Sequence, residues 1–281
     1  EKEKEEYVKM LVDEIRNCPD TVQNYRVISI FFGGGTPSLL TGEQIGRLMD
    51  TVREIFTLDE DAEITMEMNP GTVTEEKLRK YRQAGVNRLS IGLQSVNDEE
   101  LRLLGRIHTY EEFLEAYHLA RANGFANINV DLISAIPGQT VESWRRTLEQ
   151  VMALSPEHIS AYSLILEEGT TFYKKYVEDE AKEGPKLPDE DAERQMYWDT
   201  ETLMEKNGYH RYEISNYAKE GYACRHNLGY WERIPYLGFG IGAASLVPGD
   251  LIGKCRKLEG KMSRYTNPDQ LREYAHSYRN K

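Results

Sequence analysis

One phrase recurs three times along the chain and constrains its fold more than any other feature. It reads RQAGVNRLSI, RANGFANINV and EKNGYHRYEI, and each copy passes from a helical stretch through a glycine into an extended run. Glycine at such a position, here Gly85, Gly124 and Gly208, is typical of helix ends in the left-handed conformation. We interpret the phrase as one helix–strand junction that the chain uses repeatedly.

Strands and helices alternate through the first two thirds of the sequence. The predicted strands are 27–32, 63–68, 88–93, 127–133 and 158–164. Helix starts are marked by capping-box spacing at Thr41–Gln44, Asn97–Glu100 and Thr109–Glu112. This alternation predicts the α/β class, with parallel strands joined by right-handed crossovers. Because ligands bind where such strands end, the residues after each strand form the candidate site.

The last third has a different character. Residues 178–190 are polar and contain two prolines, which is typical of an exposed connection. A helix is predicted near 189–207, and the segment after it is rich in tyrosine and glycine. We predict a barrel at 1–177, the connection at 178–190 and an α+β extension at 191–281 that packs on the barrel.

Charge and hydropathy disfavour several classes of partner. The chain has 35 basic and 47 acidic residues, a formal net charge of −12. Nucleic acid and anionic membranes bind basic surfaces, so neither is an expected partner. No apolar run approaches the roughly 20 residues that span a bilayer. We expect a cytosolic protein without a transmembrane segment.

Three glycines follow the first predicted strand in FFGGGTPSLL, residues 31–40. The run lacks the lysine of a P-loop and the alternating glycines of a dinucleotide fingerprint. Two interpretations stay open: a tight turn with positive φ, or bare backbone amides against which a ligand lies. The similar GFGIGAA at 238–244 has no clear strand before it, so a dinucleotide site is disfavoured there as well.

Polar side chains stand at matched positions on three consecutive predicted strands. These are Glu67, Gln94 and Asp131, and the two carboxylates need a donor or a cation if they face the interior. A ligand ammonium or ribose would supply one, and for Glu67 a basic neighbour is the alternative. The guanidinium of Arg106 can donate two hydrogen bonds to one carboxylate. Together with Gln94, it therefore favours an amino-acid-like ligand. We interpret His108 as a surface residue at a helix start.

Metal and nucleophile motifs are scarce. The three cysteines, Cys18, Cys224 and Cys255, form no close ligand pair and are interpreted as small hydrophobic residues. Cys224 and His226 form a C-x-H without further close ligands, so a zinc site is disfavoured. No Ser-His-Asp order or HExxH motif occurs. We predict no catalytic residue and no metal ligand within this sequence.

Six segments resemble, in order and spacing, the radical S-adenosylmethionine proteins related to oxygen-independent coproporphyrinogen III oxidase. They are FFGGGTPSLL, EMNPGT, RLSIGLQS, LGRIHT, NVDLISAIPGQT and RHNLGYW. HNLGYW and LGFGIGAAS resemble the heme chaperone branch more than the decarboxylating oxidase. The resemblance implies a partial (β/α)6 barrel that binds S-adenosylmethionine and a [4Fe-4S] cluster. A first strand of that barrel is expected upstream of the sequence.

The resemblance also implies which residues bind the cofactor. The positions that match the family's S-adenosylmethionine site are Gly34, Gly35, Thr36, Glu67, Gln94, Arg106 and Asp131. The family holds its cluster with a CxxxCxxC motif, which is absent here and is expected upstream of residue 1, because the sequence starts within a helix. Ser134-Ala135 is a further departure, since relatives commonly carry Tyr-Gly there.

Three functions are open on this resemblance. The first is a chaperone that delivers heme to apo-proteins, with His226 as iron ligand, Tyr230 or Trp231 stacked on the macrocycle and Asn227 beside them. The second is oxidative decarboxylation of coproporphyrinogen III propionates to vinyl groups. The third is a nonradical small-molecule enzyme on the same barrel. Cluster chemistry implies an electron donor, and HNLGYW has the alternative interpretation of aromatic core packing.

Overall fold

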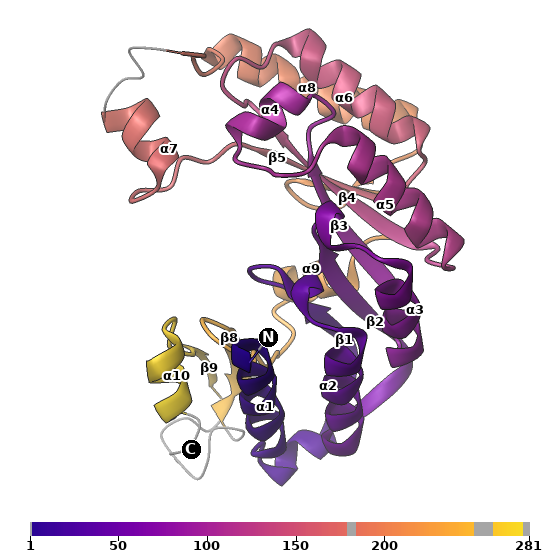
Figure 1. Cartoon of the computed structure of the whole chain (residues 1–281), viewed down its shortest axis with the longest axis vertical. Helices are drawn as coiled ribbons and strands as arrows, with labels where there is room; N and C mark the ends of the chain where they lie inside the picture. The colour runs from indigo at the N-terminus through magenta and orange to yellow at the C-terminus, as the bar shows by residue number, and fades with distance from the viewer. Residues whose placement is uncertain (1, 179–183, 250–260, 278–281) are drawn as a thin grey trace.

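Seven strands form one curved sheet in the computed structural model, which describes residues 2–178, 184–249 and 261–277 (Figure 1). The sheet order is β1-β2-β3-β4-β5-β7-β6. The strands are β1 Arg26–Phe32, β2 Thr57–Met68, β3 Arg88–Gln94, β4 Asn127–Ser134, β5 His158–Ser163, β6 His210–Arg211 and β7 Asn216–Ala218. Strands β1 to β5 are parallel, and β7 and β6 continue the sheet in antiparallel pairing. The predicted α/β half-barrel and its five strands are confirmed.

Helices cover the outer face of the sheet, whereas one short helix lies on the inner face (Figure 1). The outer helices are α1 Lys2–Arg16, α2 Gly42–Ile55, α3 Glu75–Ala84, α5 Tyr110–Ala122, α6 Val141–Ala153 and α8 Glu190–Lys206. The inner helix is α9 Arg225–Trp231. The remaining helices are α4 Asp98–Leu103, α7 Thr171–Tyr173, α10 Leu271–Ser277 and the short turns η1 Asp20–Asn24, η2 Pro37–Leu39, η3 Pro70–Thr72 and η4 Lys174–Glu178. Among the helices of the described ranges, none is long and apolar enough to cross a membrane.

Local sequence signals explain where the helices begin and end. The predicted capping boxes at Thr41–Gln44 and Thr109–Glu112 are both formed, with reciprocal hydrogen bonds. The third was wrong, because Asn97 caps α4 through the N–H of Glu99 while Glu100 turns inward to other partners. Gly85, Gly124 and Gly208 have φ values of 106°, 81° and 80°, which confirms the left-handed helix ends.

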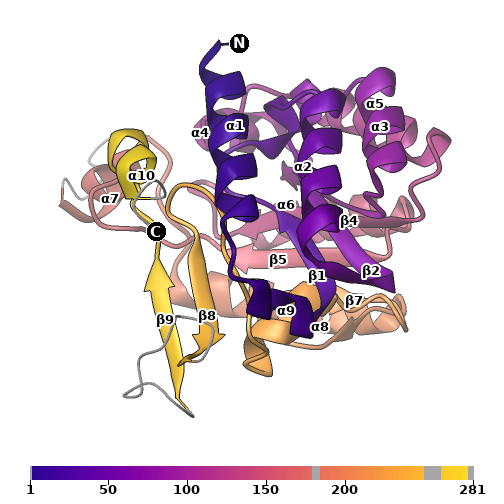
Figure 2. The ribbon, with the colours of Figure 1, turned by 90° about the horizontal axis from the view of Figure 1, so that it is seen from below.

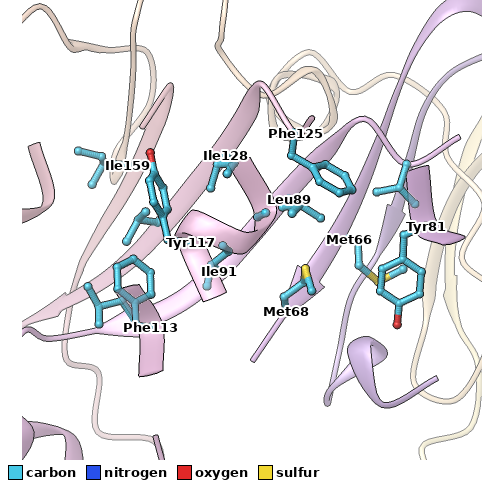
Figure 3. Packing of buried hydrophobic residues seen from close by; sticks show 14 of the residues in the cluster. Met66, Met68, Tyr81, Leu89, Ile91, Phe113, Tyr117, Phe125, Ile128 and Ile159 are labelled. Atoms are coloured by element: carbon cyan, nitrogen blue, oxygen red, sulfur yellow. The ribbon is translucent and has the colours of Figure 1, made fainter. Parts of the chain in front are cut away.

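The main core lies between the sheet and the outer helices (Figure 3). Met66, Leu89 and Ile128 point outward from neighbouring strands, where Tyr81 of α3 and Tyr117 of α5 pack against the same layer. Burying each such side chain contributes about 1.5–3 kcal/mol. The polar tips are satisfied, since the Tyr81 hydroxyl donates to the Leu40 carbonyl at 2.7 Å. This layer buries the outer face of the sheet against the helices.

The opposite face of the same strands is polar. In the parallel register Glu67 lies beside Ser90, Ser90 beside Asn129 and Asn129 beside His158. Because side chains alternate along a strand, the apolar outer layer obliges this second set to face the inside of the half-barrel. The inner face therefore presents hydrogen-bonding groups from four strands.

The C-terminal part contacts α1. A two-stranded sheet of β8 Ala244–Pro248 and β9 Met262–Thr266 lies beside α1 together with α10 (Figure 2). The glycine-rich 238–244 segment approaches α1 closely: the N–H of Gly240 donates to Glu14 at 2.8 Å. A Cβ at Gly238 would lie 2.1 Å from the Ala244 carbonyl oxygen, so close backbone packing requires this glycine. The division at 177 and 191 remains a prediction.

Candidate functional site

The glycine triplet forms an exposed loop after β1. Gly34 and Gly35 have φ values of 78° and 63°, and a Cβ at either would meet no atom within 4 Å. A turn with positive φ and unobstructed backbone are thus both present, so the two interpretations are not alternatives. At Gly33 the constraint is contact, because a Cβ would lie 2.8 Å from the Phe31 ring and 3.2 Å from Glu67.

Glu67 faces this loop from the end of β2. The N–H of Gly34 donates to its carboxylate at 3.0 Å. Burial raises the pKa of Glu67 and nearby Asp131 adds to that rise, while the Gly34 hydrogen bond opposes it. No ion pair to Glu67 occurs among the residues of the described ranges, so the predicted alternative of a basic neighbour is not supported there. This carboxyl group would gain from a cationic ligand.

Asp131 lies deeper in the half-barrel, on β4. The Asn129 amide donates to one carboxylate oxygen at 2.8 Å and the Ser90 hydroxyl to the other at 3.0 Å. Burial raises the pKa of Asp131, and these two hydrogen bonds oppose the rise. From the sequence, Asp131 was expected to need a hydrogen-bond donor or a cation. In the structure, two neutral donors, Asn129 and Ser90, fill this role.

The loops after β3 and β4 hold strained backbone. Gln94 has a φ of 73° and Ala135 a φ of 60°, which non-glycine residues rarely adopt. Such strain costs about 1–3 kcal/mol per residue and persists only where the surroundings enforce it. Glu100 contacts both loops, since its carboxylate accepts from Ser95 at 2.6 Å and from Gln139 at 2.9 Å. The two loops are thereby tied to each other.

The region after Gln94 differs from the prediction at one residue. His108 is only 3 % exposed, and its Nε2 lies 3.2 Å from the Leu93 carbonyl oxygen. The interpretation as a surface residue was wrong, because His108 packs under the end of β3. Arg106, two residues before His108, is half-buried, and its backbone N–H donates to the Leu101 carbonyl. The structure shows no ion pair of Arg106 with Glu67 or Asp131 in the described ranges.

A second brace supports the glycine loop. Thr36 directly precedes η2, and two residues later the Ser38 hydroxyl lies 2.6 Å from that of Thr72 in η3. Lys77 donates to the carbonyl oxygens of Ser38 and Thr72 at 2.7 and 3.3 Å. These contacts join the loops after β1 and β2, so the site is built from loops held together in pairs.

Helix α9 carries the HNLGYW segment on the inner face. Glu63 of β2 accepts the backbone N–H groups of Arg225 and His226 at 3.1 and 3.2 Å, and the Cys224 thiol at 3.2 Å. A carboxylate at the N-terminus of a helix accepts from backbone N–H groups that have no partner within the helix. Its negative charge also interacts favourably with the positive end of the helix dipole. Glu63 therefore fixes α9 against the wall of the half-barrel.

The imidazole of His226 is oriented by β1. Its Nδ1 lies 3.2 Å from the Ser29 hydroxyl, and its ring stacks on Phe31 at a centroid distance of 4.9 Å. Tyr230 stands edge-on to it at 5.0 Å. Burial lowers the pKa of His226, which favours the neutral ring. Tyr230 is 49 % and Trp231 57 % exposed, so core packing does not explain these two aromatic residues.

Several polar residues of the inner face were not singled out from the sequence. They are Arg88, Ser90, Asn129, His158, Ser160 and Tyr212. For the strand residues the signal was available in RLSIGLQ, NINVDLIS and HISAYS, where polar residues stand two positions apart, as in Arg88 and Ser90, Asn129 and Asp131, and His158 and Ser160. Attention to the carboxyl ends of the strands left these earlier strand positions aside, and Tyr212 lies just after β6, outside these three strands.

The described residues offer no site for the cluster of the family. No group of three or more His, Cys, Asp or Glu side chains suited to a metal occurs among them. Burial raises the pKa of Cys224 to about 11, and its thiol donates to Glu63, so it is not a ready metal ligand. Cys255 lies outside the described residues.

Known proteins resemble this chain over most of its length. The heme chaperone HemW of Escherichia coli is 43% identical over 239 residues, which cover 85% of this chain and 61% of the chaperone. HemW of Haemophilus influenzae is 38% identical over 261 residues, 93% of this chain and 64% of that protein. The chain thus spans a little under two thirds of the length of these relatives.

A solved structure and a family model agree with these relatives. Coproporphyrinogen III oxidase HemN from Escherichia coli, described as a radical SAM enzyme, superposes with a TM-score of 0.78 at 26% identity, covering 99% of this chain and 62% of HemN. The Radical SAM superfamily model matches residues 2–151. Members of that superfamily in general use S-adenosylmethionine and a [4Fe-4S] cluster. The family model covers more than half of the chain, so the chain belongs to the radical SAM superfamily.

Proposed function

We propose that the protein that contains this chain is a heme chaperone, which binds heme at α9 and delivers it to apo-proteins. One observation carries the proposal. His226 is held by Ser29 and Phe31 through one side of its ring, and its Nε2 has no hydrogen-bond partner among the described residues. Beside it stand the half-exposed rings of Tyr230 and Trp231. A neutral imidazole with a free nitrogen beside exposed aromatic surface suits an iron macrocycle.

The loops after β1 to β4 are the proposed S-adenosylmethionine site. Gly34, Gly35 and Thr36 would contact the methionyl end of the cofactor with their backbone, and Arg106 would approach its carboxylate. Glu67 and Asp131, whose pKa values burial raises, would be favoured as carboxylates by a cationic ligand. Gln94, strained at the end of β3, would offer both a donor and an acceptor.

Oxidative decarboxylation of coproporphyrinogen III is the second candidate. It is favoured by the superposition of nearly the whole chain on HemN. The chaperone ranks first because HemW of Escherichia coli is 43% identical and HemN 26% identical to this chain. Both candidates imply an electron donor, and the chaperone also implies an apo-hemoprotein recipient. A cytosolic location belongs to the same proposal.

Heme titration of the full-length protein tests the chaperone. We expect a shifted Soret band in the wild type and at least a roughly tenfold weaker heme affinity in His226→Ala, since an axial ligand is lost. The matched control is His118→Ala, an exposed histidine on α5. A Soret band that His226→Ala leaves unchanged would reject this role. Vinyl products formed from coproporphyrinogen III under anaerobic reducing conditions would instead support the oxidase.

A further inference from the structure

A series of side-chain hydrogen bonds crosses the inner face and joins the two proposed sites. Asn129 donates to Asp131 at 2.8 Å, and its Oδ1 lies 2.6 Å from Nδ1 of His158. Nε2 of His158 lies 2.7 Å from the Tyr212 hydroxyl. The same hydroxyl accepts from the Asn227 side chain of α9 at 3.2 Å. The series begins at a proposed S-adenosylmethionine ligand and ends within HNLGYW.

The orientation of the Asn129 amide is fixed on both sides. Its Nδ2 contacts the Asp131 carboxylate and lies 2.7 Å from the Ser90 hydroxyl. Its Oδ1 faces His158 and accepts from Ser160 at 3.1 Å. The flipped amide would place an oxygen against the carboxylate, which has no proton to donate. Only the observed orientation satisfies all four neighbours.

This orientation determines the tautomer of His158. Since Asn129 presents an oxygen, Nδ1 must carry the proton, and Nε2 must accept one from the Tyr212 hydroxyl. The oxygen of Tyr212 is then free to accept from Asn227. Every hydrogen bond in the series therefore points from α9 toward Asp131.

Burial makes this series respond as a unit. Asn129 and His158 are 2 % and 0 % exposed, so a broken link leaves a polar atom without water. Burial lowers the pKa of His158 well below its ordinary value and Arg88 acts in the same direction, so the ring stays neutral. Hydrogen bonds in such an interior polarise one another. A cation beside Asp131 would compete for the carboxylate that terminates the series.

We propose that His158 and Tyr212 are positioning residues that couple ligand binding at Asp131 to the placement of α9. This inference rests on the proposed function, which places S-adenosylmethionine at one end of the series and heme at the other. Coupling of this kind is reciprocal, so heme must change the affinity for S-adenosylmethionine by the same factor as the reverse.

Tyr212→Phe removes one hydroxyl group and breaks the series at its midpoint. The S-adenosylmethionine affinity of the full-length protein is measured without heme and with saturating heme. We expect a coupling factor of about tenfold in the wild type, which falls below about twofold in Tyr212→Phe. Tyr222→Phe, an exposed tyrosine in the loop before α9, is the control and should keep the wild-type factor.

Nitrogen-15 NMR of the histidine rings gives a second readout that needs neither ligand. We expect the Nδ1–H tautomer for His158 and a downfield change at Nε2 in Tyr212→Phe. An Nε2–H tautomer, or a coupling factor that Tyr212→Phe leaves unchanged, would overturn the inference. A wild type that binds each ligand without coupling would overturn it and leave the proposed function standing. A wild type that binds neither ligand would reject both.

Discussion

Gly33 stands at the end of β1 between the ring of Phe31 and the carboxyl group of Glu67. An added Cβ would lie 2.8 Å and 3.2 Å from them. Gly33→Ala is therefore expected to lower the free energy of unfolding by about 1–3 kcal/mol through overpacking. Because Glu67 must move, S-adenosylmethionine affinity should fall as well. Urea unfolding and calorimetric titration measure the two effects.

Gly46 provides the matched control for this substitution. It lies within α2, and a Cβ there would meet no atom within 4 Å. Gly46→Ala should raise the free energy of unfolding by roughly 0.5–1 kcal/mol, because alanine has the higher helix propensity. Equal effects at both positions would contradict the steric role of Gly33.

The Cys224 thiol makes stability depend on pH at the alkaline end. Burial raises its pKa from 9.0 to about 11. Below pH 9 the thiol is protonated in both states, so its contribution is fully present. As the pH rises toward 11 the unfolded state ionises first, and the free energy of unfolding should fall by roughly 2–3 kcal/mol. Urea titrations at pH 8, 10 and 11 measure this slope. In Cys224→Ala the free energy of unfolding should fall less steeply over this pH range. Parallel pH profiles of the wild type and Cys224→Ala would contradict this role of the thiol.

Individual residues also show how far the sequence alone reaches. The grouping of Glu67 and Asp131 as residues of one face was correct, because the strand period of two is a local property. His108 was misjudged because its burial depends on the Leu93 carbonyl, which lies 15 residues earlier in the chain. Tyr212 was missed for the same reason: its partner His158 is 54 residues away. Contacts across such separations leave no mark in a local pattern.

At the scale of elements, the parallel strands and their helices follow from periodicity and capping, whereas α9 does not. No capping signal marks its start, and Cys224 makes no side-chain cap. The cap comes instead from Glu63 of β2, which lies about 160 residues earlier in the sequence. A helix whose cap is supplied from a distant strand becomes visible only after the sheet is assembled.

This distant cap predicts how α9 responds to a loss of charge. Glu63→Gln keeps the size of the side chain but offers one acceptor oxygen to three donors, so we expect a loss of about 1–3 kcal/mol of stability. Hydrogen exchange at the amides of Arg225 and His226 should accelerate about tenfold or more, as local opening becomes easier. Glu60→Gln, exposed on the same strand, should leave both unchanged. Unaltered exchange in Glu63→Gln would show that other contacts hold α9.

At the scale of the whole molecule, the sheet accounts for the proposed sites but not for the attachment of the C-terminal part. We propose that the extension at 191–281 is joined to the barrel in two ways. Strand β7 pairs with β5 and so lengthens the sheet. Beyond α9, buried Glu14 of α1 accepts from Gly240, Asn267 and Tyr274 at 2.8, 2.8 and 2.6 Å.

Glu14→Gln tests the second attachment. A glutamine presents one acceptor oxygen where the carboxylate offers two, so at least one of these buried hydrogen bonds should break, at a cost of about 1–3 kcal/mol. The loss should be local, because Glu14 contacts Asn267 after β9 and Tyr274 of α10, whereas the parallel strands have their own core. Limited trypsin digestion should then cut at Arg264 and Arg272 sooner than in the wild type. Asp13→Asn, one residue away on the exposed side of α1, is the control and should digest as the wild type does. Wild-type digestion of Glu14→Gln would mean that the C-terminal part is held by contacts other than this carboxylate.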